Sequence, residues 1–240
     1  CLILKFDGTE ANIDGDGVGS LAGQSGFQVI GSALTKSRGI EYGEIVSMPE
    51  TERAIRTALQ SAQKLANSRV DHAIACVSGG SPRSYGLEGS VEIKNEIVDN
   101  NDIADVLGSC GIPAYDSDRE VLHAQPVNFS LDHKTGLSDP RGQIGKNLSV
   151  DMHMLTIKEK TIQDLAYCIK RCDLELAGVA SSSYVSALSS LVEDEKELGA
   201  ACIDLGGGST NISIFWKKHM IFAETIKMGG ELVTRDISMG

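Results

Sequence analysis

The sequence predicts an α/β fold with a smaller α+β unit inserted in its middle. Three observations support this fold class. An amphipathic helical pattern at residues 49–67 is followed by a short buried strand at 73–77. Residues 82–174 then show a different pattern of apolar and polar residues, which predicts several strands and two helices of their own. Finally, a meander of three strands with a glycine-rich turn follows at residues 200–226. Helices that alternate with buried strands are typical of α/β proteins.

The first part of the chain has strand and helix patterns in order. Apolar runs at residues 2–6 and 27–32 predict two paired strands. The helix at 49–67 has one apolar face at a spacing of 3.6 residues, made by Ile55, Ala58, Leu59, Ala62, Leu65 and Ala66. The strand at 73–77 ends in a Ser-Gly-Gly-Ser turn at 78–81. That turn is a second candidate phosphate loop, but a simple loop after a strand is the more ordinary interpretation.

Residues 82–174 predict a strand–helix–strand–strand–helix unit with its own core. The alternating strands carry Val91 and Ile93, then Val127, Phe129 and Leu131, then Leu148, Val150, Met152 and Met154. A short helix is predicted at 102–110, and a polar loop at 132–140. Thr156 and Glu159 have the spacing of a capping box, which predicts that the second helix begins there.

After this unit, the alternation of buried strands and helices seen in the first part of the chain resumes. A buried strand is predicted at 174–179 and a helix at 182–192. The charged run at 193–197 is interpreted as a solvated connector. After the meander, Gly229 and Gly230 precede a helix that begins at Glu231.

The turn of the meander, within residues 202–211, carries the clearest chemical signal. Asp204 lies at the end of an apolar run and is followed by Gly206, Gly207 and Gly208, then by Ser209 and Thr210. Glycines let backbone amides approach a phosphate, and the hydroxyls add donors. The motif lacks the lysine and the following helix of a P-loop, and it lacks the third glycine of a dinucleotide-binding fingerprint. A glycine-rich β-hairpin without a ligand is the alternative interpretation.

Composition excludes several classes of function. The chain has 240 residues, of which 33 are acidic and 22 basic, for a net charge of −11. This balance argues against direct nucleic-acid binding and against electrostatic attachment to an anionic membrane. The six cysteines (Cys1, Cys76, Cys110, Cys168, Cys172 and Cys202) lie mostly in apolar runs, which fits a reducing cytosol. Only Cys168 and Cys172 share a helix face, too few for a zinc site.

The scattered histidines do not indicate a hydrolase. His123, His133 and His153 have no matching nucleophile turn of the Gly-x-Ser-x-Gly type. We therefore interpret them as loop or packing residues. No signal peptide and no 18-residue apolar span is present in the chain.

The order of short motifs resembles the FtsA family of bacterial cell-division proteins, within the actin/Hsp70/sugar-kinase superfamily. The resemblance runs from Lys36 to the last residue. The matching stretches are 36–40 with 43–45, 74–80, 121–123, Pro126, 131–132, 136–140 with Gly145, 198–210, and Gly229 and Gly230 with 233–237. The glycine motif alone indicates only the superfamily. The Leu-His…Pro…Leu-Asp…Gly-Leu-x-Asp-Pro series within the inserted unit indicates this family.

The resemblance implies an actin-like ATPase fold (a ribonuclease H-like core) with named subdomains. Residues 1–81 and 175–196 correspond to subdomain 1A, 82–174 to the inserted, SHS2-like subdomain 1C, and 197–240 to the start of 2A. Both ends of the chain are expected to be cut. The first phosphate hairpin would precede Cys1, while subdomain 2B and a C-terminal amphipathic membrane helix would follow Gly240.

The resemblance also implies a function. ATP with Mg²⁺ would be held by Asp204, Gly206, Gly207, Gly208, Ser209, Thr210, Gly229 and Gly230, with Asp204 facing the cation through water. Gly229 and Gly230 begin a helix, and a helix N-terminus favours an anion. The protein would be a self-assembling adaptor that anchors the FtsZ ring to the cytoplasmic face of the inner membrane. FtsZ would bind 2B, subunits would associate through 1C and 2A, and later division proteins would bind 1C.

One residue departs from the family pattern. The family usually has aspartate after the two hydroxyl residues, whereas this chain has Asn211. Asparagine removes a negative charge but can still make a side-chain hydrogen bond at the turn. We therefore assign no catalytic residue and expect a nucleotide-binding scaffold, at most a weak ATPase. The alternatives are a pilus-assembly relative of the same fold, or an enzyme such as a sugar kinase or exopolyphosphatase. The sequence shows no catalytic acid in a recognisable sugar pocket, and an amphipathic helix at the C-terminus of the whole protein would favour cell division.

Overall fold

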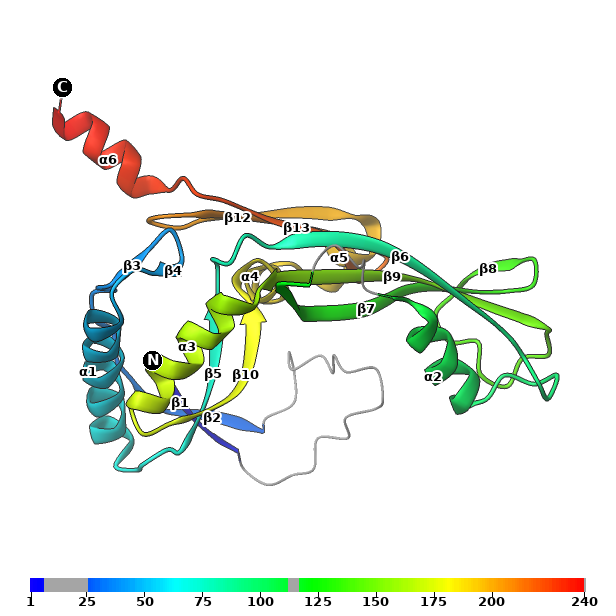
Figure 1. Cartoon of the computed structure of the whole chain (residues 1–240), viewed down its shortest axis with the longest axis horizontal. Helices are drawn as coiled ribbons and strands as arrows, with labels where there is room; N and C mark the ends of the chain where they lie inside the picture. Colours follow the sequence, from blue (N-terminus) through cyan, green and yellow to red (C-terminus); the bar gives the residue numbers. More distant parts are fainter. Residues whose placement is uncertain (7–25, 112–116, 240) are drawn as a thin grey trace. The chain divides into compact units, whose positions relative to one another are not determined.

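The computed structural model describes residues 1–6, 26–111 and 117–239. The described residues form two compact units, each assembled from separate stretches of the chain. Strands β5 (His72–Val77) and β10 (Glu175–Ser181) pair with each other (Figure 1). Each strand has its first residues in the first unit and its last residues in the second.

The first unit takes the described parts of Cys1–Ile40, Val46–Ala73 and Ala166–Ala177. The second takes Glu41–Ile45, the described parts of Ile74–Leu165, and Gly178 onwards. Helix α3 (Glu159–Arg171) contributes to both units.

The first unit contains the predicted helix and the predicted pair of strands, and the helix packs on the two-stranded sheet. Strands β1 (Leu2–Phe6) and β2 (Phe27–Ser32) are antiparallel, and helix α1 (Met48–Ala66) contacts both. A Cβ atom on Gly31 would lie 2.4 Å from the carbonyl oxygen of Ala62, so glycine lets β2 approach the helix closely. The helix ends at Asn67, which has the left-handed φ of 50° that asparagine tolerates.

In the second unit, the inserted residues form a four-stranded sheet in the order β6-β9-β7-β8. Its strands are β6 (Arg83–Glu92), β7 (Arg119–Leu131), β8 (Lys134–Leu137) and β9 (Asn147–Lys158). Strand β8 lies within the stretch predicted as a polar loop. Helix α2 (Asn100–Ser109) packs on β6 and β9 (Figure 1). It begins two residues before the predicted position because Asp99 accepts hydrogen bonds from the first free amides.

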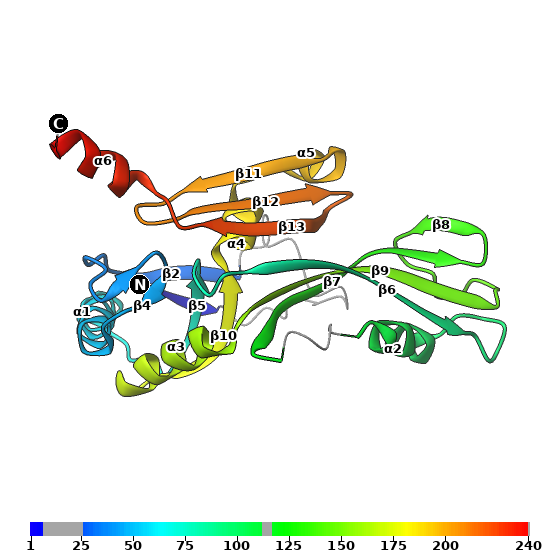
Figure 2. The same ribbon diagram turned by 45° about the horizontal axis from the view of Figure 1, so that its top comes forward.

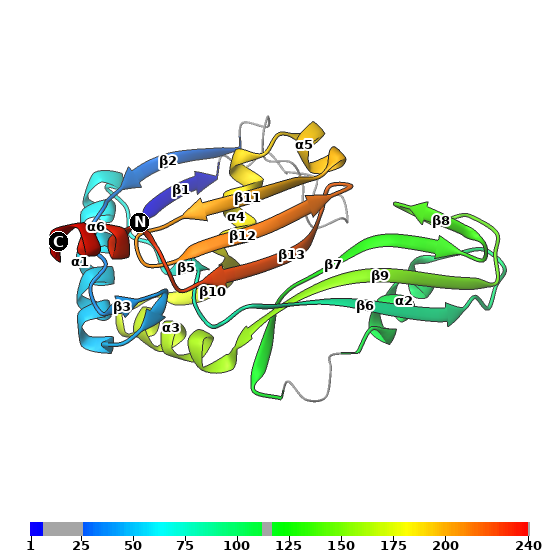
Figure 3. The same cartoon turned by 90° about the horizontal axis from the view of Figure 1, so that it is seen from above.

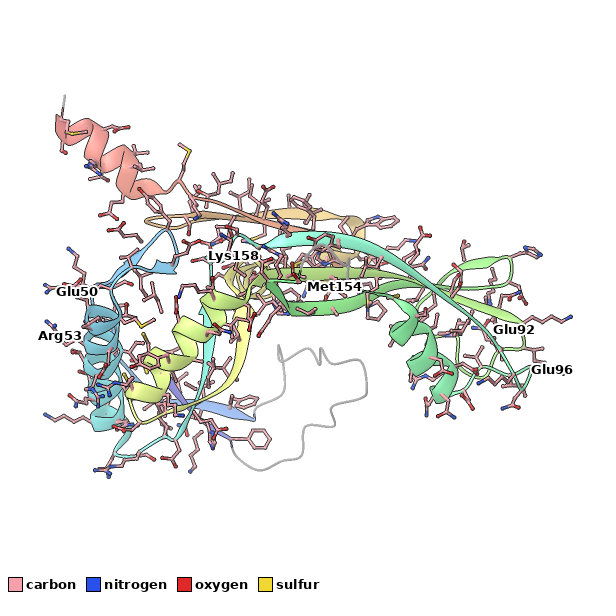
Figure 4. The ribbon with its side chains drawn as sticks, in the orientation of Figure 1. Glu50, Arg53, Glu92, Glu96, Met154 and Lys158 are labelled. Carbon is pink, nitrogen blue, oxygen red and sulfur yellow. The ribbon has the colours of Figure 1, made fainter. Side chains whose placement is uncertain are left out.

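Strand β9 is buried on both faces at its end. Met154 (labelled in Figure 4) belongs to the core of the inserted sheet. Leu155 packs with Tyr184 and Phe215 in a second core. The predicted capping box is therefore wrong. Thr156 stays in the strand, where its hydroxyl accepts a hydrogen bond from Arg119 Nε at 2.8 Å, and the helix begins only at Glu159.

The end of the second unit is the predicted meander. Strands β11 (Ala200–Leu205), β12 (Thr210–Trp216) and β13 (His219–Ile226) pair in this order, and helix α4 (Ser182–Ser190) packs on them (Figures 2 and 3). Helix α6 (Gly230–Met239) follows.

The charged run before β11 is a helix rather than a connector. It forms α5 (Glu193–Leu198), whose first turn holds three acids. Acids at a helix N-terminus are stabilised by the free amides and the helix dipole, which explains why the charged run folds. The backbone amide of Val192 donates to the Glu195 carboxylate at 3.0 Å, which completes the N-terminal turn.

A small hairpin, whose residues 41–45 belong to the second unit, lies close to the glycine turns. Its strands are β3 (Ile40–Glu41) and β4 (Glu44–Ile45). Among the described residues, no helix is long and apolar enough to cross a membrane.

Candidate functional site

The glycine motif forms a tight hairpin between β11 and β12. Leu205 pairs with Thr210, and the amide of Gly206 donates to the carbonyl of Ser209 at 2.9 Å. The predicted residues Asp204 to Thr210 therefore lie together, with Leu205 between Asp204 and the turn, and with Ser209 buried within the turn.

Gly229 and Gly230 lie against this hairpin, although they are about twenty residues further along the chain. The amide of Gly230 donates to the carbonyl of Gly206 at 3.0 Å, and the amide of Glu231 donates to that of Gly207 at 2.8 Å. The structure thus brings all eight predicted site residues into one place. A Cβ on Gly229 would lie 2.4 Å from the Gly207 oxygen, so this approach requires glycine.

These contacts give the start of α6 a structural role. The amides of Gly230 and Glu231 are two of the free donors that a helix N-terminus offers to an anion. Here they bind hairpin carbonyls instead. The hydroxyl of Thr210 likewise donates to the carbonyl of Met228 at 2.7 Å. A direct contact of Gly229, Gly230 and Thr210 with phosphate therefore stays a prediction.

Gly207 has a different environment from its neighbours. A Cβ on Gly206 would meet the carbonyl of Ser209 at 2.8 Å, whereas a Cβ on Gly207 would meet no described atom within 4 Å. Gly207 is also absent from the glycines with positive φ. Neither packing nor backbone conformation within the described residues explains why residue 207 lacks a side chain.

A row of polar side chains crosses the three strands of the meander next to the residue pair that closes the glycine hairpin. Asp204, Asn211 and Thr225 are register partners on the three adjacent strands. The amide Nδ2 of Asn211 donates to Asp204 Oδ2 at 3.4 Å, and the Thr225 hydroxyl donates to Asn211 Oδ1 at 2.8 Å. Ser186 of α4 donates to Asp204 Oδ2 at 3.0 Å. Asn211 is 3% exposed, so its hydrogen bonds are buried.

The β3–β4 hairpin contacts both glycine turns. A Cβ on Gly208 would lie 3.4 Å from the amide nitrogen of Tyr42. On the other side, a Cβ on Gly43 would lie 2.6 Å from the nitrogen of Gly79, in the Ser-Gly-Gly-Ser turn. A Cβ on Gly79 would in turn lie 2.2 Å from the carbonyl oxygen of Gly43, so close backbone packing requires glycine at both positions. This favours the simple structural interpretation of that turn.

A second buried polar cluster joins β13 to the inserted sheet. Ser84 Oγ donates to the carbonyl of Ala223 at 2.9 Å and accepts from its amide at 2.8 Å. His153 Nε2 lies 3.1 Å from the same hydroxyl, and it must donate because the hydroxyl proton is already used. Burial lowers the pKa of His153 to about 4. His153 therefore packs as a neutral ring, in line with the expected packing role.

Three residues beside the glycine hairpin and Asp204 were not predicted from the sequence: Thr225, Ser186 and Tyr42. Thr225 could have been found by extending the strand alternation, because residues opposite Asp204 and Asn211 follow from a regular meander. Ser186 and Tyr42 come from a helix and a hairpin elsewhere in the chain, and no local pattern places them beside the glycine turn.

Comparison with known proteins shows similarity in fold and, separately, similarity in sequence. The structure matches the PilM–PilN type IV pilus biogenesis complex with a TM-score of 0.58 over 89% of this chain and 59% of that chain, at 11% identity. At that identity the match shows the fold alone. The chain has an actin-like ATPase fold, with an SHS2 insert at residues 79–156 that matches the family described as the SHS2 domain inserted in FtsA.

By sequence, the chain is similar to several proteins that are named cell division protein FtsA. The chain is 37% identical to cell division protein FtsA of Rhizobium meliloti over 89% of its length, and 33% identical to that of Pseudomonas aeruginosa over 92%. It covers 48% and 53% of those proteins, so it spans about half the length of the relatives it matches. The expected resemblance to FtsA is confirmed.

Proposed function

We propose that this chain is the part of an ATP-binding, actin-like cell-division adaptor that carries one phosphate-binding hairpin. The open space beside Gly207 is the main observation that supports nucleotide binding. The missing side chain of Gly207 leaves open space beside a turn, and nothing in the described packing requires it. A ligand that approaches the backbone closely explains that glycine, because any Cβ would stand between the backbone and the ligand.

The hairpin also supplies donors. Within the described residues, the amides of Gly207, Gly208 and Ser209 donate no backbone hydrogen bond, so they can bind phosphate oxygens. Asp204, one residue before the turn, fits a Mg²⁺ ion that keeps most of its water ligands. When bound, the cation would neutralise phosphate charge. In this proposal Gly229, Gly230 and Thr210 hold the hairpin in shape and come within reach of the same ligand.

The division role rests on the relatives, which are named cell division proteins. We propose that the whole protein anchors the FtsZ ring to the inner membrane, associates with itself and recruits later division proteins through the inserted domain. Its place would be the cytoplasmic face of the membrane at the division site. Identity of 37% to FtsA favours this role over pilus assembly, where the likeness is limited to the fold.

Titration calorimetry of the full-length gene product with ATP and Mg²⁺ tests nucleotide binding. Gly207→Asp should weaken binding by tenfold or more, since the added carboxylate repels the phosphates and fills the open space, a change of about 1.4 kcal/mol or more. Gly86→Asp is the matched control, because Gly86 also has open space around its Cβ position and lies in the inserted sheet. Unchanged affinity of Gly207→Asp would remove Gly207 from the site.

The adaptor role has its own test. The full-length gene product should sediment with FtsZ filaments and, separately, with vesicles that contain anionic lipid. A protein that binds ATP but neither FtsZ nor vesicles would keep the nucleotide site and contradict the adaptor role.

A further inference from the structure

The Asp204 carboxylate is held by two neighbours from different elements. Ser186 Oγ of α4 donates to Oδ2 at 3.0 Å, and Asn211 Nδ2 of β12 donates to the same oxygen at 3.4 Å. Within the part of the chain that the structure describes, Oδ1 accepts no hydrogen bond. One oxygen of the carboxylate is therefore used to orient the group, while the other keeps its lone pairs.

The orientation of Asn211 is itself determined by its surroundings. Its Oδ1 accepts from the Thr225 hydroxyl at 2.8 Å, which leaves Nδ2 toward Asp204. The reversed amide would place Oδ1 against the Asp204 carboxylate, and two acceptors without a proton between them repel each other. Since Asn211 is 3% exposed, water cannot relieve that repulsion. The side chain is thus a fixed donor.

We propose that Ser186 and Asn211 are positioning residues, which hold Asp204 so that its second oxygen binds the water shell of the divalent cation that accompanies the nucleotide. This inference rests on the proposed function and adds residues to its site. A carboxylate with one oriented oxygen loses less conformational freedom when a cation binds, so the cation contributes more to affinity.

The same geometry explains what a neutral residue at position 211 does. Asn211 and Asp204 are neighbours within hydrogen-bond distance, and Asn211 is buried. A second carboxylate there would make a pair of like charges that only a proton or a cation could stabilise. With asparagine, the site carries one carboxylate and binds the cation together with the nucleotide's phosphates rather than alone.

The first experiment measures how much Mg²⁺ improves ATP binding, as the ratio of the Kd in EDTA to the Kd with Mg²⁺, in the full-length gene product. Ser186→Ala should reduce this ratio about fivefold or more, because it removes a hydrogen bond to a charged group. Ser186→Thr should restore the ratio. Ser189→Ala is the matched control, since its hydroxyl donates only to the Ser186 carbonyl on the same helix.

The second experiment needs no nucleotide. Asn211→Asp is compared with the wild type by thermal unfolding, with Mg²⁺ alone and with EDTA. The variant should be less stable than the wild type in EDTA and should gain several degrees in Tm with Mg²⁺, more than the wild type gains. An equal response of the two proteins would overturn the close approach of residue 211 to Asp204.

The outcomes separate this inference from the function on which it rests. If the wild type binds ATP with a Mg²⁺ benefit that Ser186→Ala keeps in full, positioning by Ser186 is wrong and the proposed function stands. If the wild type binds no ATP, both are overturned. If Ser186→Ala weakens ATP binding equally in EDTA and in Mg²⁺, the role of Ser186 is structural only, and this result also overturns the inference.

Discussion

The Lys227 ammonium lies 2.9 Å from the Glu44 carboxylate, which links the segment after β13 to the β3–β4 hairpin. Both side chains are partly exposed, at 49% and 37%, so the pair contributes little to stability. The ion pair matters because of its position. It joins the hairpin whose residues Tyr42 and Gly43 lie against the two glycine turns.

Charge reversal tests this ion pair. Glu44→Lys should lower the free energy of unfolding by no more than about 1 kcal/mol, because the new repulsion is screened by solvent. Lys227→Glu in the same chain should restore most of the loss. Denaturant unfolding at low and high salt measures both effects. A double variant no more stable than Glu44→Lys would show that the two side chains do not interact in solution.

The packing of Gly43 on Gly79 has a matched control within the chain. Gly43 and Gly142 have the same φ of 78°, but a Cβ on Gly142 would meet no described atom within 4 Å. Ala at either position carries the left-handed strain of about 1 kcal/mol. Gly43→Ala should lose a further 1–3 kcal/mol or so from the clash with Gly79. Chemical denaturation compares the two variants, and equal losses would contradict the close approach.

The closure of the hairpin by Gly229 predicts a contrast with Gly207. Gly229→Ala should lower stability by about 1–3 kcal/mol, because its Cβ would meet the carbonyls of Gly207 and Gly206 at 2.4 and 2.6 Å. Gly207→Ala should stay within about 0.5 kcal/mol of the wild type, since nothing described lies near. Thermal unfolding without nucleotide measures both, and a strongly destabilised Gly207→Ala would assign that glycine to packing.

The buried His153 predicts a pH dependence. Its pKa falls from 6.5 to about 4 on folding, so the unfolded chain binds a proton at a higher pH than the folded chain does. The contribution of the neutral His153 to the free energy of unfolding should therefore be fully present above about pH 6.5. It should be lost as the pH falls toward 4, by an amount on the order of 2–3 kcal/mol.

His153→Gln should flatten this decline, because glutamine keeps a donor for Ser84 and takes up no proton. His133→Gln, at an exposed turn position, is the control and should keep the wild-type profile. Burial also lowers the pKa of His123, so part of the decline should remain in His153→Gln. Urea unfolding between pH 4 and 7.5 measures the profiles. A variant with the full wild-type decline would contradict the buried neutral ring.

Local sequence patterns were sufficient for most elements. The apolar face of 49–67 and the alternation in 200–226 predict α1 and the meander, because amphipathic periods report which face is buried. The same reasoning failed at Thr156 and at residues 193–197. A capping box and a strand residue look alike locally, and the choice depends on Arg119 and on pairing with β6 and β7.

The glycine hairpin was predictable from its own residues, and its acid, three glycines and two hydroxyls favour phosphate binding, which stays a prediction. What the sequence determined was therefore the hairpin and, through the family resemblance, the fold. Only the tertiary structure decided that α6 closes the hairpin with its first amides and that Ser186 and Asn211 donate hydrogen bonds to Asp204. It also decided that Gly207, of the three glycines in the turn, is the one that faces open space among the described residues. The reason is physical: these properties depend on distances between atoms of separate elements, which no local pattern encodes.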